Sequence, residues 1–283
     1  MRRFAVILFV LGGTLFFVLP VDESRTLPPD SLQAAIDAAA PGTTITIPAG
    51  THTGPFRITG KTDLTLKGAV DAVLTAKGND VLTIYDSAGI VLEGFTLVGD
   101  YQMRGQKCVT VAGLRGGAFR DLTIRDAGNS GIYSNGVFSN ITISGCNISH
   151  CGDFGVHFQA GGDGVLVEDC VFSDFASVLY PGHGVYAKTS ANVTVRNCEV
   201  SRVRHLSGNG DGGFQIADCT NAQVVDCVAH DNDKFGFIVD GGVATFIRCR
   251  GQNNGVTDFY ECGCTTPSTY IDCTGTFSSS PSQ

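Results

Sequence analysis

Five short segments, each opening with glycine, carry the side chains best suited to chemistry. Aligned on that glycine, they are Gly131-Ile-Tyr-Ser-Asn135, Gly155-Val-His-Phe-Gln159, Gly184-Val-Tyr-Ala-Lys188, Gly213-Phe-Gln-Ile-Ala217 and Gly236-Phe-Ile-Val-Asp240. Their alternation predicts strands whose second and fourth residues point inward and whose third and fifth point outward. The turns that enter such strands add four polar residues, namely Asp153, His183, Asp211 and Lys234.

Stacking these strands in register would turn the outward positions into two rows. The first row holds Tyr133, His157, Tyr186, Gln215 and Ile238, and the second holds Asn135, Gln159, Lys188, Ala217 and Asp240. Neighbours in a row of parallel strands lie about 4.8 Å apart. We therefore expect His157, Tyr186 and Lys188 to fall within one patch of the size of a sugar.

A face of this composition suits a carbohydrate, because aromatic rings stack on sugars and amides bind hydroxyls. Elimination across a uronate C4–O bond needs a base for the C5 proton, a cation for the developing charge and an acid for the leaving oxygen. His157, Lys188 and Tyr186 can supply these roles in that order. A C5-epimerase uses the same groups and returns the proton to the opposite face.

The candidate residues fall into two sets. The expected catalytic residues are His157, Tyr186, Lys188, His183 and Asp211. The expected substrate-binding residues are Tyr133, Asn135, Gln159, Gln215, Asp153, Lys234 and Asp240. The alternative interpretation is a polar outer face without function, since half of the residues in such strands face water.

A loose repeat of 22–29 residues organises the chain from about residue 90. A second strand type, with apolar residues at alternate positions, ends in each repeat at a shared position held by Cys146, Cys170, Cys198, Cys227, Cys249 and Cys273. Repeats of this length that contain only strands predict an all-β solenoid, the parallel β-helix. An amphipathic helix over residues 30–40 would cap its first coil.

The cysteine position is a core position, because Leu122 and Phe95 hold it in earlier coils. We expect a stack of free thiols there, since stacked neighbours about 4.8 Å apart are too distant for a disulfide. The other five of the eleven cysteines are Cys108, Cys151, Cys219, Cys262 and Cys264. Their pairing stays open, and Cys262-Gly-Cys264 lacks the second ligand pair of a zinc site.

The ends of the chain differ from its middle. Residues 1–24 begin with Met-Arg-Arg and an apolar run, which predicts a secretory signal peptide or an uncleaved N-terminal anchor. Residues 25–275 form the expected β-helix domain, and residues 276–283 a flexible tail. We therefore expect a secreted or extracytoplasmic protein that contacts a membrane only through its N-terminus.

Composition excludes several classes of function. The 283 residues are 43% hydrophobic and only 16% charged, which argues against long disordered stretches or a coiled coil. The net charge of −8 has the wrong sign for a general nucleic-acid binder. The partner that fits is a polysaccharide, and an anionic one if Lys188 binds a carboxylate.

The helix, the Ile47-Pro-Ala-Gly-Thr51 turn and the cysteine- or asparagine-bearing coils resemble the pectate-lyase-like superfamily over residues 28–275. This resemblance implies a right-handed single-stranded β-helix. It leaves the activity open, because the superfamily holds lyases, hydrolases, epimerases, tailspikes and non-catalytic surface proteins. Many lyases of this fold use Ca²⁺, for which Asp231-Asn232-Asp233 offers oxygen ligands. The same three residues also suit a polar turn.

Gly182-His183-Gly184 resembles a motif of polygalacturonases, which are inverting hydrolases of this fold. Inverting hydrolysis needs two carboxylates, and in the corresponding coils only Asp153 remains. We therefore favour a lyase or C5-epimerase that acts on a uronate-containing polysaccharide. A non-catalytic carbohydrate-binding or surface protein is the main alternative, and a hydrolase is less favoured.

Overall fold

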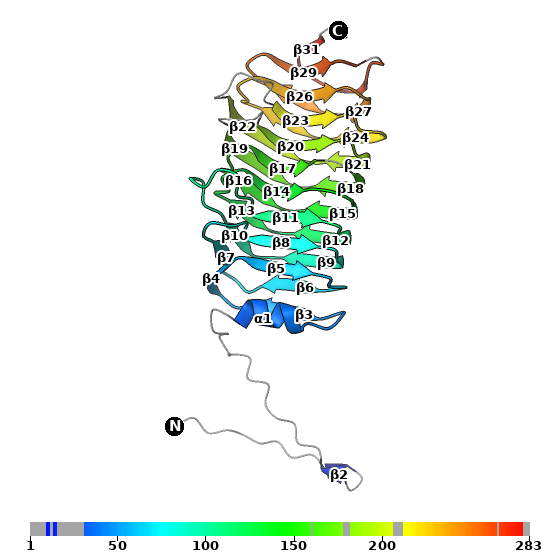
Figure 1. Cartoon of the computed structure of the whole chain (residues 1–283). Helices are drawn as coiled ribbons and strands as arrows, with labels where there is room; N and C mark the ends of the chain where they lie inside the picture. The colour runs from blue at the N-terminus through cyan, green and yellow to red at the C-terminus, as the bar shows by residue number, and fades with distance from the viewer. Residues whose placement is uncertain are drawn as a thin grey trace.

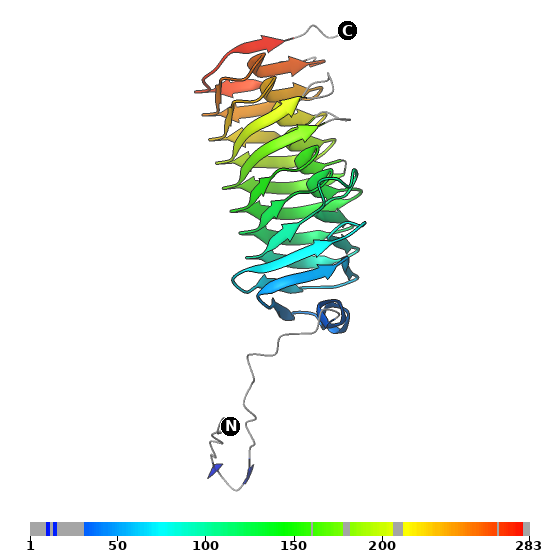
Figure 2. The same ribbon diagram turned by 90° about the vertical axis from the view of Figure 1, so that its left-hand side faces the viewer.

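Alternating apolar residues, separated by turns, divide each coil of the chain into three strands. The computed structural model describes residues 31–159, 161–177, 182–205, 212–264 and 266–279, and also the backbone of 10–11 and 14–15. Within this part, successive coils stack into three parallel sheets of ten, nine and ten strands. Figures 1 and 2 show the resulting solenoid in two views. The all-β solenoid predicted from the repeat is confirmed.

Sheet 1 contains the strands that precede the cysteine position. They are β3 (Thr44–Ile47), β6 (Thr65–Gly68), β9 (Ala88–Glu93), β12 (Arg115–Arg120), β15 (Phe138–Ser144), β18 (Gly162–Glu168), β21 (Ala191–Arg196), β24 (Ala222–Val225), β27 (Ala244–Ile247) and β30 (Thr269–Ile271). Sheet 2 follows that position with β4 (Gly50–Gly54), β7 (Ala72–Ala76), β10 (Thr96–Val98), β13 (Thr123–Arg125), β16 (Asn147–Ser149), β19 (Val171–Ser177), β22 (Glu199–His205), β25 (Val228–His230) and β28 (Arg250–Gln252).

Sheet 3 contains the five strands of the glycine alignment together with the strands stacked before and after them. It consists of β5 (Phe56–Thr59), β8 (Leu82–Tyr85), β11 (Val109–Ala112), β14 (Ser130–Ser134), β17 (Phe154–Phe158), β20 (His183–Lys188), β23 (Gly212–Ala217), β26 (Phe235–Asp240), β29 (Thr257–Cys262) and β31 (Phe277–Ser279). Strand β31 lies inside the segment that we expected as the C-terminal tail, and it pairs with β29.

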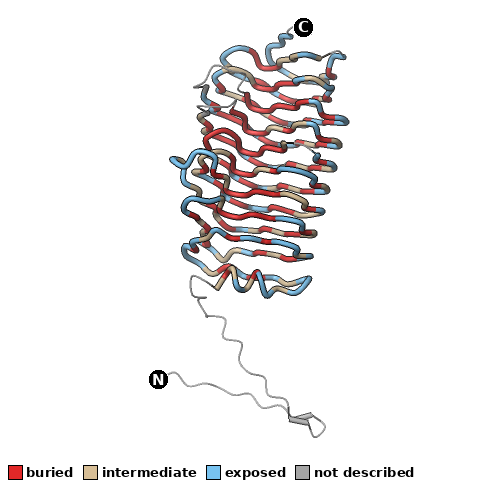
Figure 3. Tube along the Cα trace, in the orientation of Figure 1, coloured by how far each residue is buried: buried red, intermediate tan, exposed pale blue. Residues whose placement is uncertain are grey.

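The inward side chains of the three sheets form one continuous core. Figure 3 shows that buried residues recur in coil after coil of the stack. Equivalent residues of successive coils stack directly, as the register requires. The ring centroids of Phe214 and Phe237 are 5.0 Å apart, those of Phe237 and Phe259 are 4.8 Å apart, and both pairs are nearly parallel. These separations match the spacing of parallel strands, about 4.8 Å. Register therefore fixes the packing of the core.

The first coil is covered by the predicted helix, α1 (Ser31–Ala38). Leu32 and Ile36 of this helix are buried against the core, and Figure 1 shows α1 across the N-terminal end of the stack. Residues 1–24 lie outside the described part except for a short antiparallel pair, β1 (Val10–Leu11) and β2 (Thr14–Leu15). No helix in the described part is long and apolar enough to cross a membrane.

The turn from sheet 1 to sheet 2 has a recurring conformation. The residue before each cysteine position has a positive φ, for example 54° at Asp169 and 48° at Asn197. Asparagine and aspartate tolerate this region better than most residues do. The turns also bond to one another, because Asn197 Nδ2 donates to Asp169 Oδ1 at 2.6 Å. These turns hold the coils in register at the corner of the solenoid.

The cysteine stack is present as predicted. Of its six members, Cys146, Cys170, Cys198, Cys227 and Cys249 are buried and Cys273 is half-buried. The Cys146 amide donates to Cys170 Sγ at 3.4 Å, and Cys146 Sγ donates in turn to the Phe119 carbonyl at 3.5 Å. All eleven cysteines are free thiols. The stacked thiols thus serve as small core residues.

Denatured but unreduced protein should therefore titrate with at least six free thiols. The reason is that in-register stacking holds the cysteine side chains parallel, at a separation unsuited to a disulfide. The count comes from reaction with a chromogenic disulfide in denaturant. A Cys198→Ala variant should show one thiol fewer. Five disulfides and a single thiol would contradict the packing described above.

Candidate functional site

The outer face of sheet 3 has the register that the glycine alignment predicts. Tyr133 pairs with His157, His157 with Tyr186 and Tyr186 with Gln215. In the second row, Lys188 pairs with Ala217, and Ala217 with Asp240. The candidate residues of five consecutive coils therefore share one surface.

Five aromatic side chains on β14, β17 and β20 form a compact group, which we call the ring cluster: Tyr133, Phe154, His157, His183 and Tyr186. The imidazole of His157 lies at its centre, with centroids 4.2 Å from Phe154, 4.9 Å from Tyr186 and 5.2 Å from Tyr133. His183 lies 5.3 Å from Tyr186. The cluster brings together four of the predicted residues, and its members bury one another.

This mutual burial corrects our expectation of an open, solvated face. His157 is only 8% exposed, His183 is fully buried and Gln215 is 9% exposed. The outward direction of His157 and Gln215 was predicted correctly, but their accessibility was not. Large rings on adjacent strands, about 4.8 Å apart, cover each other. The polar atoms in the cluster are consequently desolvated.

Desolvation keeps both imidazoles of the cluster uncharged. Burial lowers the pKa of His157 to about 4, an effect opposed by a hydrogen bond with the Gln159 side chain and reinforced by the cations Lys188 and Lys107. Burial also lowers the pKa of His183 to about 3. His183 Nδ1 lies 3.1 Å from the Gly212 carbonyl, whereas Nε2 of each histidine is buried without a hydrogen-bond partner.

The rim of the cluster keeps its charge. Burial raises the pKa of Tyr186 to about 12, with the carboxylates of Asp240 and Asp218 adding to it, so the phenol stays protonated at neutral pH. Lys188 is half-buried, and within the described part of the chain it forms no ion pair. Gln215 Nε2 lies 3.5 Å from Asp240 Oδ2. A cation and a carboxylate therefore flank the ring cluster, in which the phenol of Tyr186 stays protonated.

The remaining predicted residues lie apart from the cluster. Asn135 is exposed just after β14, and Lys234 is half-buried in the turn before β26. Asp153 is buried, accepts a hydrogen bond from Asn129 Nδ2, and lines a separate hollow of about 130 Å³ with Tyr101 and other residues of loop 99–107. Asp211 lies outside the described residues.

Sequence reasoning missed two members of this surface. Phe154 pairs with His183, and each residue directly precedes the aligned glycine of its strand, so extending the glycine alignment by one residue would have found it. Lys107 belongs to loop 99–107, which has no counterpart in other repeats, and its Nζ lies 5.2 Å from the centroid of the Tyr133 ring. No repeat signal could have placed that lysine.

Asp231-Asn232-Asp233, the segment considered above for Ca²⁺, forms the contacts of a polar turn. Asn232 Oδ1 accepts from the Val203 amide at 3.0 Å, and its Nδ2 donates to Asn254 Oδ1 at 2.9 Å. Asp233 forms an ion pair with Arg204 at 2.8 Å. Among the residues that the structure describes, no three His, Cys, Asp or Glu side chains gather closely enough to bind a metal ion.

Comparison with known proteins identifies the family. A family model described as a right-handed beta helix region matches residues 80–250. The chain belongs to this family. The pectate-lyase-like architecture inferred from the sequence is thereby confirmed, with its right-handed coil. No curated protein matches the chain by sequence.

Several solved structures share the β-helix. Tailspike protein 2 of Escherichia coli O157:H7 bacteriophage CAB120 aligns at a TM-score of 0.60 and 12% identity over 85% of this chain, which spans only 36% of the tailspike. A rhamnogalacturonan lyase aligns at a TM-score of 0.56 and 14% identity, over 86% of this chain and 82% of the lyase. Pectate lyase Pel9A aligns at a TM-score of 0.51 and 15% identity, over 85% of this chain and 72% of the lyase. At these identities the likeness shows the fold.

The buried histidines should make stability depend on pH. Unfolded histidine titrates near 6.5, whereas His157 and His183 in the fold bind a proton only near pH 4 and 3. The unfolded chain therefore binds more protons in between, so stability is complete above pH 6.5 and falls as the pH is lowered. We expect a loss of up to about 1.4 kcal/mol per pH unit for each histidine.

Denaturant unfolding between pH 7 and 4.5 measures this slope. In His157→Phe the slope should decrease by one histidine's share, because no titrating group remains at that position. Tyr133→Phe alters the same cluster without removing a group that titrates in this range, so it should keep the parental slope. Equal slopes in all three proteins would show that His157 is not held neutral by the fold.

Proposed function

We propose that this protein is a polysaccharide lyase or C5-epimerase that acts on a uronate-containing polymer. Its site is the outer face of sheet 3 around the ring cluster, Lys188 and Asp240. The observation that carries the proposal is the Lys188 ammonium, which has no ion-pair partner among the described residues, on the same face as the protonated phenol of Tyr186 and the neutral imidazole of His157. One face thus presents the three chemical groups that uronate elimination requires.

Each group has the protonation state that its role demands. Lys188 is placed to bind the uronate carboxylate and to stabilise the negative charge that develops when the C5 proton leaves. Tyr186 keeps its proton at neutral pH and can donate it to the leaving oxygen. The uncharged His157 can accept the C5 proton.

The position of His157 adds a condition to this mechanism. Its Nε2 is buried under the neighbouring rings, so the imidazole must turn outward to reach a substrate proton. A base with a pKa near 4 is also weak until it gains contact with water or with an anion. Substrate binding that displaces Phe154 or Tyr186 would remove both obstacles.

The comparisons support a polysaccharide as the ligand, because a pectate lyase and a rhamnogalacturonan lyase share this fold. The cations on the proposed face support an anionic polymer. Action on an external polymer also fits the basic and apolar start of the chain, which we take as a secretory signal or anchor. On this proposal, only that segment contacts a membrane.

Non-catalytic carbohydrate binding is the second candidate function. The observation that favours it is the burial of both imidazoles, which leaves aromatic edges, Lys188 and Asp240 as the accessible groups of the site. Such a surface can bind a sugar by stacking and charge without removing a proton. The two candidates differ in turnover and share the ligand.

Replacing Lys188 by alanine should distinguish them. In a lyase or epimerase, Lys188→Ala should lower turnover about 10²–10³-fold, because it removes a charge that matters chiefly in the transition state. Tyr186→Phe should lower turnover and leave the melting temperature nearly unchanged. Lyase activity is read from the ultraviolet absorbance of unsaturated products, and epimerase activity from NMR of the polymer.

Lys67→Ala is the matched control, since Lys67 lies on sheet 1 in an exposed ion pair with Glu93. It should behave as the parent does. A parent that binds uronate polymers without turnover, and loses affinity in Lys188→Ala, would be a non-catalytic binder. Parental activity and binding in both site variants would place the site elsewhere.

A further inference from the structure

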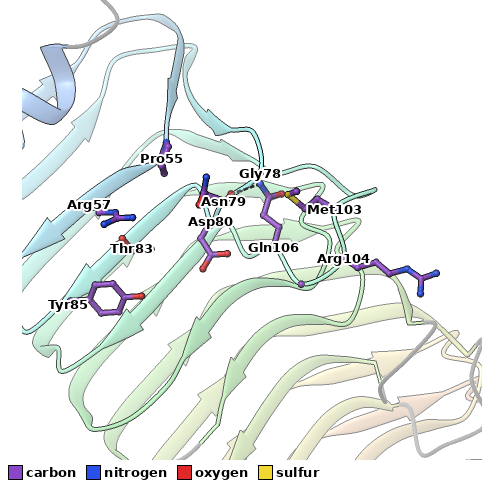
Figure 4. A pocket seen from close by; sticks show the side chains of 11 residues that line it. Pro55, Arg57, Gly78, Asn79, Asp80, Thr83, Tyr85, Met103, Arg104 and Gln106 are labelled. Carbon is purple, nitrogen blue, oxygen red and sulfur yellow. Dashed lines mark hydrogen bonds between the residues drawn. The ribbon is translucent and has the colours of Figure 1, made fainter.

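A groove of about 460 Å³ lies on the outer face of sheet 3, N-terminal to the ring cluster (Figure 4). Arg57 of β5 and Thr83 and Tyr85 of β8 line one side. Loop 99–107 lines the other with Met103 and Gln106. None of these residues belongs to the site described above.

The wall of the groove is rigid. The buried amide of Gln106 donates to the carbonyls of Asn79 at 2.6 Å and Ala76 at 3.2 Å, and it accepts from the Asp100 amide. Loop 99–107 is thereby tied to the turn before β8. The groove is formed before any ligand binds, which lowers the cost of binding one.

The charged side chains in the groove differ in whether they have hydrogen-bond partners. Asp80 accepts from the Lys107 amide at 2.9 Å and from Thr110 Oγ1 at 2.6 Å, so both of its oxygens are occupied. Arg57 is exposed, and within the described residues its guanidinium forms no ion pair. Asp80 keeps its negative charge, but its oxygens are engaged by neutral donors, so the Arg57 guanidinium is the group on this side of the groove that is available to bind an anion.

Tyr85 supplies the surface for a sugar ring. Its side chain is 37% exposed, and it lies on the strand next to Arg57 and two residues farther along. A guanidinium binds a carboxylate through two parallel hydrogen bonds, and a phenol ring stacks on the face of a pyranose. This pair is arranged for a sugar that carries a carboxylate.

The groove continues into the ring cluster. Arg57 shares its row with Thr83, Thr110, Tyr133, His157 and Tyr186 through successive strand pairs. Tyr85 and Lys188 occupy the second row, four strand spacings apart, which is about 19 Å. A single extended polymer along the solenoid axis can therefore contact both.

We propose that Arg57 and Tyr85 form a second subsite that binds a uronate unit of the same polymer, away from the reacting unit. This inference rests on the proposed function for the identity of the ligand. The subsite contributes affinity for long chains and takes no part in the chemistry. It predicts that the polymer lies parallel to the axis of the solenoid.

The test is calorimetric titration of the full chain with size-fractionated oligogalacturonate and oligoalginate. Fractions longer than about 19 Å can span both sites, and the shortest fractions fill only one. Arg57→Ala should weaken binding of long fractions about tenfold and leave binding of the shortest fractions and turnover on them unchanged. Tyr85→Ala should act in the same direction. Arg57→Lys should recover part of the loss, because lysine keeps the charge without the bidentate fork.

Arg115→Ala is the control, because Arg115 is an exposed arginine on β12 of sheet 1. It should bind both fractions as the parent does. Parental affinity of Arg57→Ala for long fractions, or an equal loss for short and long ones, would overturn the subsite. Neither result affects the interpretation of the Lys188→Ala experiment. If Arg57→Ala loses affinity for long fractions while Lys188→Ala keeps the parental turnover, the subsite stands and the catalytic proposal is overturned. A parent protein that binds neither polymer would overturn both proposals.

Discussion

In-register stacking of coils, at about 4.8 Å per strand, is the constraint on which the rest of the structure depends. It makes every position of the repeat into a column of like residues. The phenylalanine column of Phe214, Phe237 and Phe259 uses that spacing because it is also a favourable distance between stacked rings. The same spacing leaves the stacked cysteines as thiols, since it suits close packing and not a disulfide.

The constraint acts on the outer face of sheet 3 as well. Neighbouring rings there lie so close that they remove one another from water, as those of Tyr133, Phe154 and Tyr186 do for His157. Desolvation then sets the chemistry, because it favours the neutral imidazole and the protonated phenol. Lys188 and Asp240 lie at the rim of this dry patch. The arrangement of charged groups around neutral ones follows from row spacing and ring size.

Part of this arrangement was predictable from the sequence. The rows of sheet 3 and the cysteine stack were predictable, because a period of two and an aligned glycine or cysteine fix direction and register together. Burial of His157 was not, since alternation gives the side of a sheet on which a residue lies and nothing about what covers it. Lys107 and Gln106 escaped prediction because loop 99–107 has no equivalent in other coils. The turn residues Asp169 and Asn197 were visible in the sequence, but their common left-handed conformation emerged only in the structure.

The distribution of ion pairs separates structural cations from those that are available to a ligand. On sheets 1 and 2, arginines bond carboxylates of neighbouring coils, as in Arg196 with Glu168 and Arg202 with Asp174. These pairs repeat along the stack and join adjacent coils. On the outer face of sheet 3, the cations Arg57, Lys107 and Lys188 form no such pair within the described residues. The chain carries a net charge of −8. Leaving these cations without carboxylate partners on one face destabilises the isolated fold only slightly, because their side chains are partly in water. A bound polyanion stabilises these cations much more, because each desolvated contact between a cation and a carboxylate is a charge-assisted hydrogen bond.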